Sequence, residues 1–594
     1  MIEPMKKYAC LVYHQEYLPF LQGLQAVGAM HVVERRAGMD ETEVKSAEQF
    51  IKKVDNLLND LQQRKHPETP ETFAGAGEEL AQDLMEMLEE EEKLTQQIKR
   101  LQHQREQDQV WGSYDGELIN RLKQKGINFY LFEVKKGKWK ANWEEQVAVD
   151  FLHKTPQARY GVVISDGEKP NWQEVKWRDF PEKSLMLLDK EQKEKETLLA
   201  QLSQQIDLHA QQHLEVLRQT KADVLSKLNF DKVLLNTERS SENRLMVLEG
   251  YVPASREEAV NTFLEESGVF YLADQPTEDE PVPIKLRNSR FSQLFEPITK
   301  LFALPGYNEL DLTPFFAPFF LLFFGFCLGD TGYGLLLFLG ATALKFKLDK
   351  SYRPYLTLAQ VLAIPTMLFG AWSGTVFGIA LVEEPSLSSL HAYFLDYDSM
   401  FNLALGLGVA QIMFGLGVQA WQKWKFDGLQ HALAPIGWLV LIISLLDVYL
   451  VFFLPEITQY TGWLGVAFVF LFSSPEGSIG ARIGGGIWGL YGITGIFGDV
   501  LSYIRLFALG VSTSILGLVI NSIAWQFGQS PYVGPVVMAI ILILGHGLNL
   551  AIALLGAFVH PMRLTFVEFY KNAGFKGGGV AYQPFKRATV KSDN

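Results

Sequence analysis

Residues 498–521 read GDVLSYIRLFALGVSTSILGLVIN, an apolar run that carries an arginine, Arg505, near its middle. A charged side chain deep in a membrane helix costs several kcal/mol, so a protein retains one where it meets a partner charge or an ion pathway. A second arginine, Arg563, lies in the next apolar run, LLGAFVHPMRLTFVEF at 554–569. Two arginines on neighbouring spans therefore predict that this chain moves charge across a membrane.

The second half of the chain, from Thr313 onward, consists of apolar runs long enough to cross a bilayer, which takes about 20 residues of helix. Lys and Arg gather in the loops after the even-numbered runs and in the C-terminal tail, whereas the loop LVEEPSLSSLHAYFLDYDS at 381–399 is acidic. By the positive-inside rule, both ends of the chain are expected in the cytoplasm, with the spans in the cell membrane. The sequence predicts an all-α bundle of eight transmembrane helices, at 313–329, 331–347, 356–381, 399–422, 432–454, 457–474, 486–526 and 533–570.

The seventh predicted span is unusually long. About 40 residues of helix extend roughly 60 Å, twice the hydrocarbon thickness, so this helix must tilt or run past the bilayer. At about 100° per residue, Ser502, Arg505 and Ser512 fall on one face, which begins at Gly498. Small, hydroxyl and charged side chains on one face predict that this face meets something other than lipid.

The eighth predicted span carries a polar stripe. His546, Asn549, His560 and Arg563 share one face at three- and four-residue steps, and Glu568 follows them. Such a stripe suits a water-accessible groove, but interhelical hydrogen bonds and snorkelling near the cytoplasmic end would also account for it. Both interpretations stay open at this point. Three further carboxylates are expected inside the membrane, and the first of them could simply cap the turn between the first two spans; they are Asp330, Asp447 and Asp499.

The first half of the chain is charged and predicts a cytoplasmic domain. Three segments carry long helical patterns without Pro or Gly, at Glu43–Lys65, Glu78–Gln109 and Leu187–Leu228. The last of them would make a rod of roughly 63 Å, and a rod that leaves and returns within one domain is an antiparallel coiled-coil hairpin. Short β-like runs between the helices predict one or two small α+β lobes at the ends of the rod. We expect a cytoplasmic domain at 1–295, a transmembrane domain at 296–575 and a cytoplasmic tail at 576–594.

Several function classes find no support in the sequence. The net charge of −13 argues against nucleic acid as a partner. The two cysteines lie in different halves and suggest neither a disulfide framework nor a metal site. There is no CxxC, HExxH, Walker A or GxSxG motif, and the GDTGYG at 329–334 is interpreted as a turn between spans. The N-terminus lacks the features of a signal peptide. No cofactor and no catalytic residue are expected.

Four segments together resemble one family, the membrane-embedded a subunit (subunit I) of rotary V-type and A-type ATPases. SYIRLFALGVSTS around Arg505 is similar to the seventh-helix motif of that family, and HPMRLTFVEFY is similar to its eighth-helix motif. FGFCLGDTGYG resembles its early glycine turn, and EGYVPAS resembles a motif of its soluble domain. The resemblance covers the whole chain in order. The compact first half, of about 300 residues, is more similar to the bacterial and archaeal branch.

The resemblance implies a stator subunit that is not itself an enzyme. Its partners would be a rotating ring of c (proteolipid) subunits, the peripheral stalk E and G subunits, a central-stalk or collar subunit, and membrane lipid. Arg505, with Arg563 beside it, would face the ring between two offset half-channels and favour the deprotonated ring carboxylate during H⁺ or Na⁺ transfer. The residues that could line the half-channels are Asp499, Ser502, Ser512, His546, Asn549, His560 and Glu568. This sequence differs from the eukaryotic members at two positions: Thr513 stands where they often carry His, and Ala553 where they often carry Glu. The proton path of the eukaryotic members therefore does not transfer to this chain in detail.

The competing interpretation is an ion-coupled secondary transporter or channel with a cytoplasmic regulatory domain. Such transporters often carry internal repeats, but no repeat relates spans one to four with spans five to eight. A transporter or channel would also leave the long charged helices of the first half unexplained.

Overall fold

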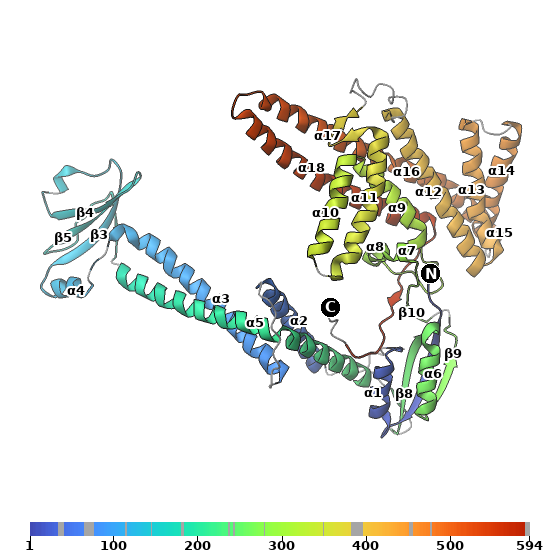
Figure 1. Cartoon of the computed structure of the whole chain (residues 1–594), viewed down its shortest axis with the longest axis horizontal. Helices are drawn as coiled ribbons and strands as arrows, with labels where there is room; N and C mark the ends of the chain where they lie inside the picture. Colours follow the sequence, from blue (N-terminus) through green and yellow to red (C-terminus); the bar gives the residue numbers. More distant parts are fainter. Residues whose placement is uncertain are drawn as a thin grey trace. The chain divides into compact units, whose positions relative to one another are not determined.

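The chain folds into two compact units, each with its own β-sheet (Figure 1). The first unit comprises Met1–Arg35 and Thr237–Lys586, and the second comprises Arg36–Asn236. This structure is a computed structural model that describes residues 1–33, 41–64, 76–112, 114, 116–143, 145–179, 183–235, 238–240, 244–277, 280–348, 350–381, 396–450, 455–475 and 478–588. Most of the predicted acidic loop at 381–399 and the last six residues of the predicted tail lie outside the described residues.

The first unit begins with a five-stranded antiparallel sheet, in which β8 pairs with β1, β2 and β7, and β9 pairs with the other edge of β1. Alternate residues of β1, such as Tyr8, Cys10 and Val12, are buried, as expected for a strand with one covered face. Helices α1 and α6 pack against each other through Phe20 and Phe263, whose rings stack at 5.7 Å. The elements are β1 (Met5–Tyr13), α1 (Tyr17–Val27), β2 (His31–Val32), β7 (Glu238–Ser240), β8 (Leu245–Pro253), α6 (Glu257–Glu266) and β9 (Phe270–Asp274).

The second unit consists of long helices and a second lobe. Helices α2 (Glu41–Gln63), α3 (Gly77–Asp108) and α5 (Leu185–Leu235) share an apolar seam of leucine, isoleucine and alanine side chains. One ion pair joins Arg105 near the end of α3 to Asp189 near the start of α5 at 2.6 Å. Gly77, at the start of α3, lies beside Thr220 of α5, so the two helices run antiparallel. At 51 residues, α5 is longer than the predicted rod.

The lobe of the second unit is a four-stranded antiparallel sheet with strand order β4-β5-β3-β6. Its core is aromatic, and the rings of Trp143 and Trp172 stack 4.8 Å apart at an interplanar angle of 9°. Strands β4 and β6 were not among the predicted β-like runs. Polar and charged residues interrupt the apolar residues in both strands, and β6 has only four residues. The elements are α4 (Gly116–Gln124), β3 (Asn128–Lys135), β4 (Ala148–Lys154), β5 (Ala158–Ser165) and β6 (Val175–Arg178).

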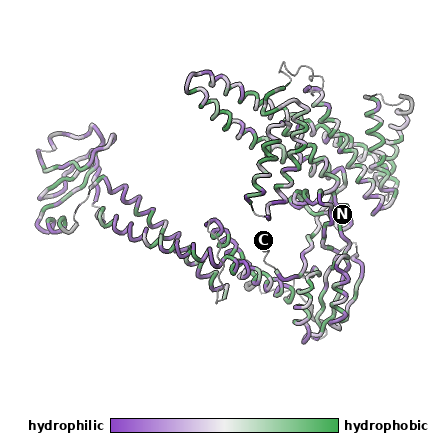
Figure 2. The backbone as a smooth tube through the Cα atoms, in the orientation of Figure 1, coloured by the Kyte–Doolittle hydropathy of each residue, from purple (hydrophilic) through white to green (hydrophobic). Residues whose placement is uncertain are grey.

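The apolar part of the first unit contains helices at all eight predicted positions, and Figure 2 shows hydrophobic residues concentrated along them. Among the described residues, five helices are long and apolar enough to cross a membrane, or six if α9 and α10, bent by 120° to each other, count as one span. The chain is thus a multi-pass membrane protein, and the count of eight stays a prediction. The helices are α9 (Thr313–Leu328), α10 (Thr331–Lys347), α11 (Arg353–Ser373), α12 (Tyr397–Phe426), α13 (Leu429–Leu450), α14 (Pro455–Phe472), α15 (Ile479–Tyr491), α16 (Ile493–Ser502), α17 (Ile504–Gly528) and α18 (Gly534–Arg563).

The turn between α9 and α10 is held by Asp330, whose side chain is buried. Its Oδ1 accepts hydrogen bonds from the N–H of Tyr333 at 3.0 Å and of Phe377 at 2.9 Å, and its Oδ2 accepts from Gly378 at 2.8 Å. The first bond caps α10, which confirms the capping interpretation of this carboxylate. The other two fix a small hairpin, β11 (Thr375–Val376) and β12 (Ile379–Ala380), against the helices.

Helices α15, α16 and α17 form one helical series of 50 residues, Ile479–Gly528, which would extend about 75 Å at 1.5 Å per residue. Helix α18 continues through a π-helical turn at Leu564–Phe569 into the short α19 (Tyr570–Asn572). In the most apolar 18-residue stretch of Ile479–Gly528, only 22% of the residues are buried, and in that of Gly534–Asn572 only 11%. In the other three spans this share is 33–39%. The two long helices therefore leave the largest share of their surface for lipid or for a partner.

The end of the chain returns to the first lobe. After α19, the strand β13 (Val580–Ala581) pairs in parallel with β10 (Pro283–Ile284). Beyond it, the Tyr582 hydroxyl donates to the Ala29 carbonyl at 2.6 Å, and Phe585 N donates to the Met30 carbonyl at 2.7 Å. The predicted boundary near residue 295 stays a prediction, because the first lobe and the membrane helices belong to one compact unit.

Candidate functional site

Arg505 lies in the first turn of α17, directly after the break in the helical series at Tyr503. The Tyr503 side chain is fully buried, and its hydroxyl donates to Gln411 Oε1 on α12 at 2.6 Å. This contact fixes the break against a neighbouring helix. The Nη1 of Arg505 is buried, and among the described residues it has no hydrogen-bond acceptor. No described carboxylate forms an ion pair with this guanidinium within 4.0 Å.

His560 and Glu568 each interact electrostatically with both Arg505 and Arg563, and we call the four residues Arg505, His560, Arg563 and Glu568 the arginine cluster. Glu568 is 2% exposed, and its Oε2 is buried without a hydrogen bond in the described chain. It lies in the π-helical turn that follows Arg563, and such turns occur often at functional sites. Arg563 itself is exposed at the surface of α18.

Unpaired polar atoms concentrate on the elements that carry this cluster and on α12, which packs against α17. In the described part of the chain, eight buried side-chain nitrogen or oxygen atoms lack a hydrogen-bond partner. Folded proteins leave few such groups, and each carries a desolvation cost of about 1–3 kcal/mol unless water or a ligand satisfies it. Six of the eight belong to α12, α17 and the segment 560–570, namely Gln411, Arg505, His560, Thr565, Glu568 and Tyr570.

Asp499 lies six residues before Arg505, and its carboxylate bonds to side chains of α19, the short helix that follows α18. Lys571 Nζ lies 3.1 Å and 3.0 Å from its two carboxylate oxygens, and Asn572 Nδ2 donates to Oδ2 at 2.9 Å. Asp499 therefore does not pair with Arg505. The Ser502 hydroxyl donates to its own helix at the Gly498 carbonyl, and Ser512 is exposed.

His546 and Asn549 lie in a second polar network, away from the arginine cluster. The Tyr333 hydroxyl lies 2.7 Å from His546 Nδ1 and accepts from Asn549 Nδ2 at 2.8 Å. Asn521 Oδ1 lies 2.9 Å from His546 Nε2. These are the interhelical hydrogen bonds of the alternative interpretation, and they join α10, α17 and α18. Asp330 is connected to the same region through the hairpin, because Asn521 Nδ2 donates to the Phe377 carbonyl.

Sequence reasoning missed three residues that organise these networks, Tyr333, Gln411 and Tyr503. A tyrosine two residues from a buried arginine was a usable signal for Tyr503, whereas Gln411 stands alone in an apolar run and becomes visible only through packing. In the described part of the chain, no group of three His, Cys, Asp or Glu side chains could hold a metal ion.

Comparisons with known proteins find relatives of this chain. Residues 178–354 match the model of the V-type ATPase 116kDa subunit family. The V-type ATP synthase subunit I of Borreliella burgdorferi is 29% identical over 522 residues, which cover 83% of this chain and 84% of that protein. The V-type ATP synthase subunit I 1 of Treponema pallidum is 25% identical and covers 99% of this chain and 100% of its own. The A-type ATP synthase subunit I of Methanocaldococcus jannaschii is 31% identical over 58% of this chain and 55% of that protein.

Proposed function

The chain belongs to the subunit I family of V-type and A-type ATP synthases, and from that premise we propose that it is the ion-conducting stator of a rotary motor. It is a membrane subunit of a rotary ATPase. In our proposal it works without catalysing ATP chemistry, and its two long membrane helices face a ring of c subunits that carry buried carboxylates. The low burial of these helices, 22% and 11%, supports this part of the proposal, since a ring would cover surface that the chain leaves open.

The observation that carries the proposal is the unpaired Nη1 of Arg505. A guanidinium cannot lose its proton in a protein, so the buried Nη1 of Arg505, which has no acceptor in the described chain, would stabilise a negative charge that another molecule brings to it. A passing ring carboxylate would supply that charge for part of each cycle. The guanidinium would favour the ionised carboxylate and so promote ion release, while its positive charge would keep ions from crossing directly between the half-channels.

Two polar regions would form the half-channels on either side of Arg505. One is the arginine cluster with Ser502, whose unpaired polar atoms would be satisfied by water that enters from the cytoplasmic side. Asp499 and its Lys571 partner would stand at the mouth of this path. The other is the network of His546 and Asn549 with Tyr333, which would lie toward the opposite side, with Ser512 between the two on the exposed face of α17.

The second unit would act as a strut. Its helices α3 and α5 are long and charged, and they hold a separate lobe at one end, which suits a connection to the peripheral stalk E and G subunits and to a central-stalk or collar subunit. Both chain ends would lie in the cytoplasm and the spans in the cell membrane. Removal of Arg36–Asn236 should uncouple or disassemble the complex; a coupled, assembled complex without this unit would contradict the strut role.

The ion-transfer role is tested at Arg505 in the assembled complex. Arg505→Ala should leave ATP hydrolysis by the soluble head intact and reduce ion pumping into sealed vesicles to background. Arg505→Lys should also fail, because a compact ammonium does not reproduce the planar, weakly hydrated guanidinium. A matched control is Arg482→Ala, which makes the same change on the same helical series at an arginine that bonds the Pro475 carbonyl. Normal pumping by Arg505→Ala would refute the proposal.

A further inference from the structure

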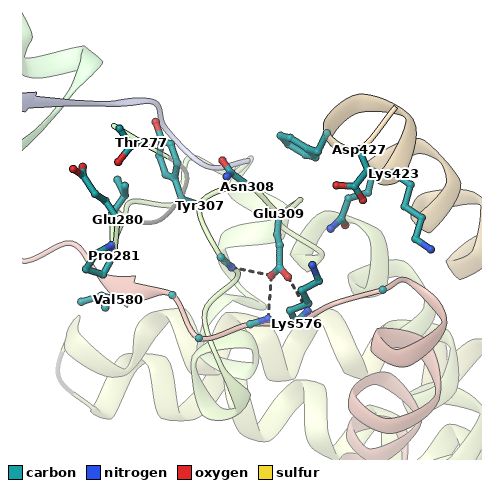
Figure 3. A pocket seen from close by; sticks show the side chains of 18 of the residues that line it. Thr277, Glu280, Pro281, Tyr307, Asn308, Glu309, Lys423, Asp427, Lys576 and Val580 are labelled. Atoms are coloured by element: carbon teal, nitrogen blue, oxygen red, sulfur yellow. Dashed lines mark hydrogen bonds between the residues drawn. The ribbon is translucent and has the colours of Figure 1, made fainter. Parts of the chain in front are cut away.

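A polar cavity of about 590 Å³ lies between the membrane helices and the segments that lead to the first lobe (Figure 3). Its walls come from four parts of the first unit: the segment around Glu280, the segment around Glu309, the end of α12, and the glycine-rich segment after α19. Pockets of about 300–1,000 Å³ are typical of small-ligand sites. This volume is larger than an inorganic phosphate requires and would admit a phosphate with its substituents.

The two glutamates of the cavity wall are already occupied by the protein. Glu309 is 9% exposed, and its carboxylate accepts from the backbone N–H of Gly306 at 2.8 Å, Lys576 at 2.8 Å and Gly577 at 3.0 Å. Glu280 accepts from Lys7 Nζ at 2.7 Å and from the Tyr251 hydroxyl at 3.0 Å. Lys7 offsets the charge of Glu280, and the carboxylate oxygens of Glu309 are directed toward three backbone donors and so away from a ligand.

The other charged side chains of the wall belong to two lysines and one aspartate. Lys423 and Asp427 extend from the end of α12, across the cavity from Glu309 and Lys576 (Figure 3). Lys423 and Lys576 repel each other, and Asp427 offsets only one of the two charges. In the described chain, neither lysine forms an ion pair within 4.0 Å. The side-chain amides of Asn308, Gln419 and Gln422 add donors to the same cavity.

The cavity lies at the level of the membrane surface. Lys423 belongs to the last turn of α12, which is one of the five apolar spans. Trp421 and Trp424 on the same turn are 42% and 63% exposed. Tryptophan is enriched where the bilayer meets water, so this turn marks the level of the lipid headgroups.

We propose that this cavity binds a phosphate-bearing anion, with Lys423 and Lys576 as the two positive charges that hold it. Ammonium groups bind phosphate oxygens as point charges, and two of them with amide donors around a cavity of this size match one phosphate group. The phosphate comes either from an anionic lipid headgroup at the membrane surface or from a soluble phosphate. Binding would join the end of α12 to the chain segment after α19, a property separate from ion transfer at Arg505.

The test uses the full-length chain in nanodiscs. One arm compares phosphatidylcholine discs with discs that also contain phosphatidylglycerol, and native mass spectrometry counts the retained phosphatidylglycerol. The other arm titrates inorganic phosphate into phosphatidylcholine discs by calorimetry. Lys423→Gln with Lys576→Gln should weaken binding about tenfold for each lysine, which corresponds to about 1.4 kcal/mol for each lost positive charge. Lys425→Gln is the control, because this nearby lysine lies over the Phe426 ring and outside the cavity wall.

Binding of phosphatidylglycerol alone identifies the lipid headgroup, and binding of inorganic phosphate identifies the soluble source. Asn308→Trp, a change in an exposed loop position of the wall, should block binding in either arm by filling the cavity without removing a positive charge. The proposal is overturned if the unaltered chain binds neither probe. It is also overturned if the double lysine variant binds as tightly as Lys425→Gln does.

Discussion

Replacement of Asp330 by alanine should destabilise the membrane half more than any other single loss of a carboxylate at a helix N-cap. The side chain is 1% exposed, and it accepts three backbone N–H groups, from Tyr333, Phe377 and Gly378. Each donor left buried and unpaired costs about 1–3 kcal/mol, so the total is about 3–9 kcal/mol. This loss is comparable to the whole stability of many domains, about 5–15 kcal/mol.

The hairpin depends on this carboxylate for its conformation as well. Phe377 has φ 51° and Gly378 has φ 70°, and a non-glycine residue in the left-handed region stores about 1–3 kcal/mol of strain. The Gly378 backbone also lies against that of Gly517 on α17, where a side chain would not fit. Without Asp330, the strained turn is expected to relax and to separate from α17.

Thermal unfolding in detergent, followed by fluorescence-detected size exclusion, checks this prediction. Asp396→Ala is the matched control: Asp396 caps α12 with one hydrogen bond to Ser399 N at 3.1 Å and is exposed, so its loss should cost only about 1 kcal/mol. Asp330→Asn should fall between the two, because one of its acceptor oxygens becomes an N–H donor that faces Gly378. Equal melting temperatures for Asp330→Ala and Asp396→Ala would refute the reasoning.

Three further perturbations test other contacts. Lys571→Ala should cost less than about 1 kcal/mol of stability, because the lysine side chain is 57% exposed. If Asp499 stands at a channel mouth, the same change should slow ion pumping, measured as a rate in sealed vesicles. Burial tends to raise the pKa of Glu3, but hydrogen bonds from Ser255 and Lys285 outweigh it, and the folded pKa lies below the ordinary 4.5. Its contribution to stability is therefore complete above pH 4.5 and is lost as the pH falls through the folded pKa. Glu3→Gln should make the melting temperature depend less on pH in this acidic range. Tyr582→Phe removes one hydrogen bond to the first lobe and should cost about 1 kcal/mol by denaturation, and an unchanged midpoint would mean that the tail does not stabilise the lobe.

Periodic signals in the sequence predicted the long elements well. The helical patterns at 43–65, 78–109 and 187–228 correspond to α2, α3 and α5, and the run around Arg505 lies in the long helical series. These patterns are local, since apolar spacing reports which side of a helix is buried. The same reasoning could not find the breaks at Gly492 and Tyr503, because a helix break inside an apolar run depends on what packs against it.

Contacts between residues far apart in the chain could not be predicted from the sequence. Asp330 was predicted as a cap, but its two bonds to the hairpin join residues 47 and 48 positions apart. In the same way, the polar stripe on α18 looked uniform, whereas packing divides it between two networks. His546 and Asn549 bond to Tyr333, while His560 and Glu568 belong to the arginine cluster. A stripe on one helix does not say which neighbour each residue faces.

The stacked tryptophans of the second unit make its lobe optically distinguishable from the rest of the protein. Trp139, Trp143, Trp172 and Trp177 are linked by ring contacts of 4.8–5.7 Å, and they are four of the twelve tryptophans in the chain. Indole transitions coupled at such separations are expected to produce a paired near-ultraviolet circular dichroism band, and isolated tryptophans in the membrane helices would not. Loss of this band on heating would report the melting of one lobe inside an intact complex, without any label.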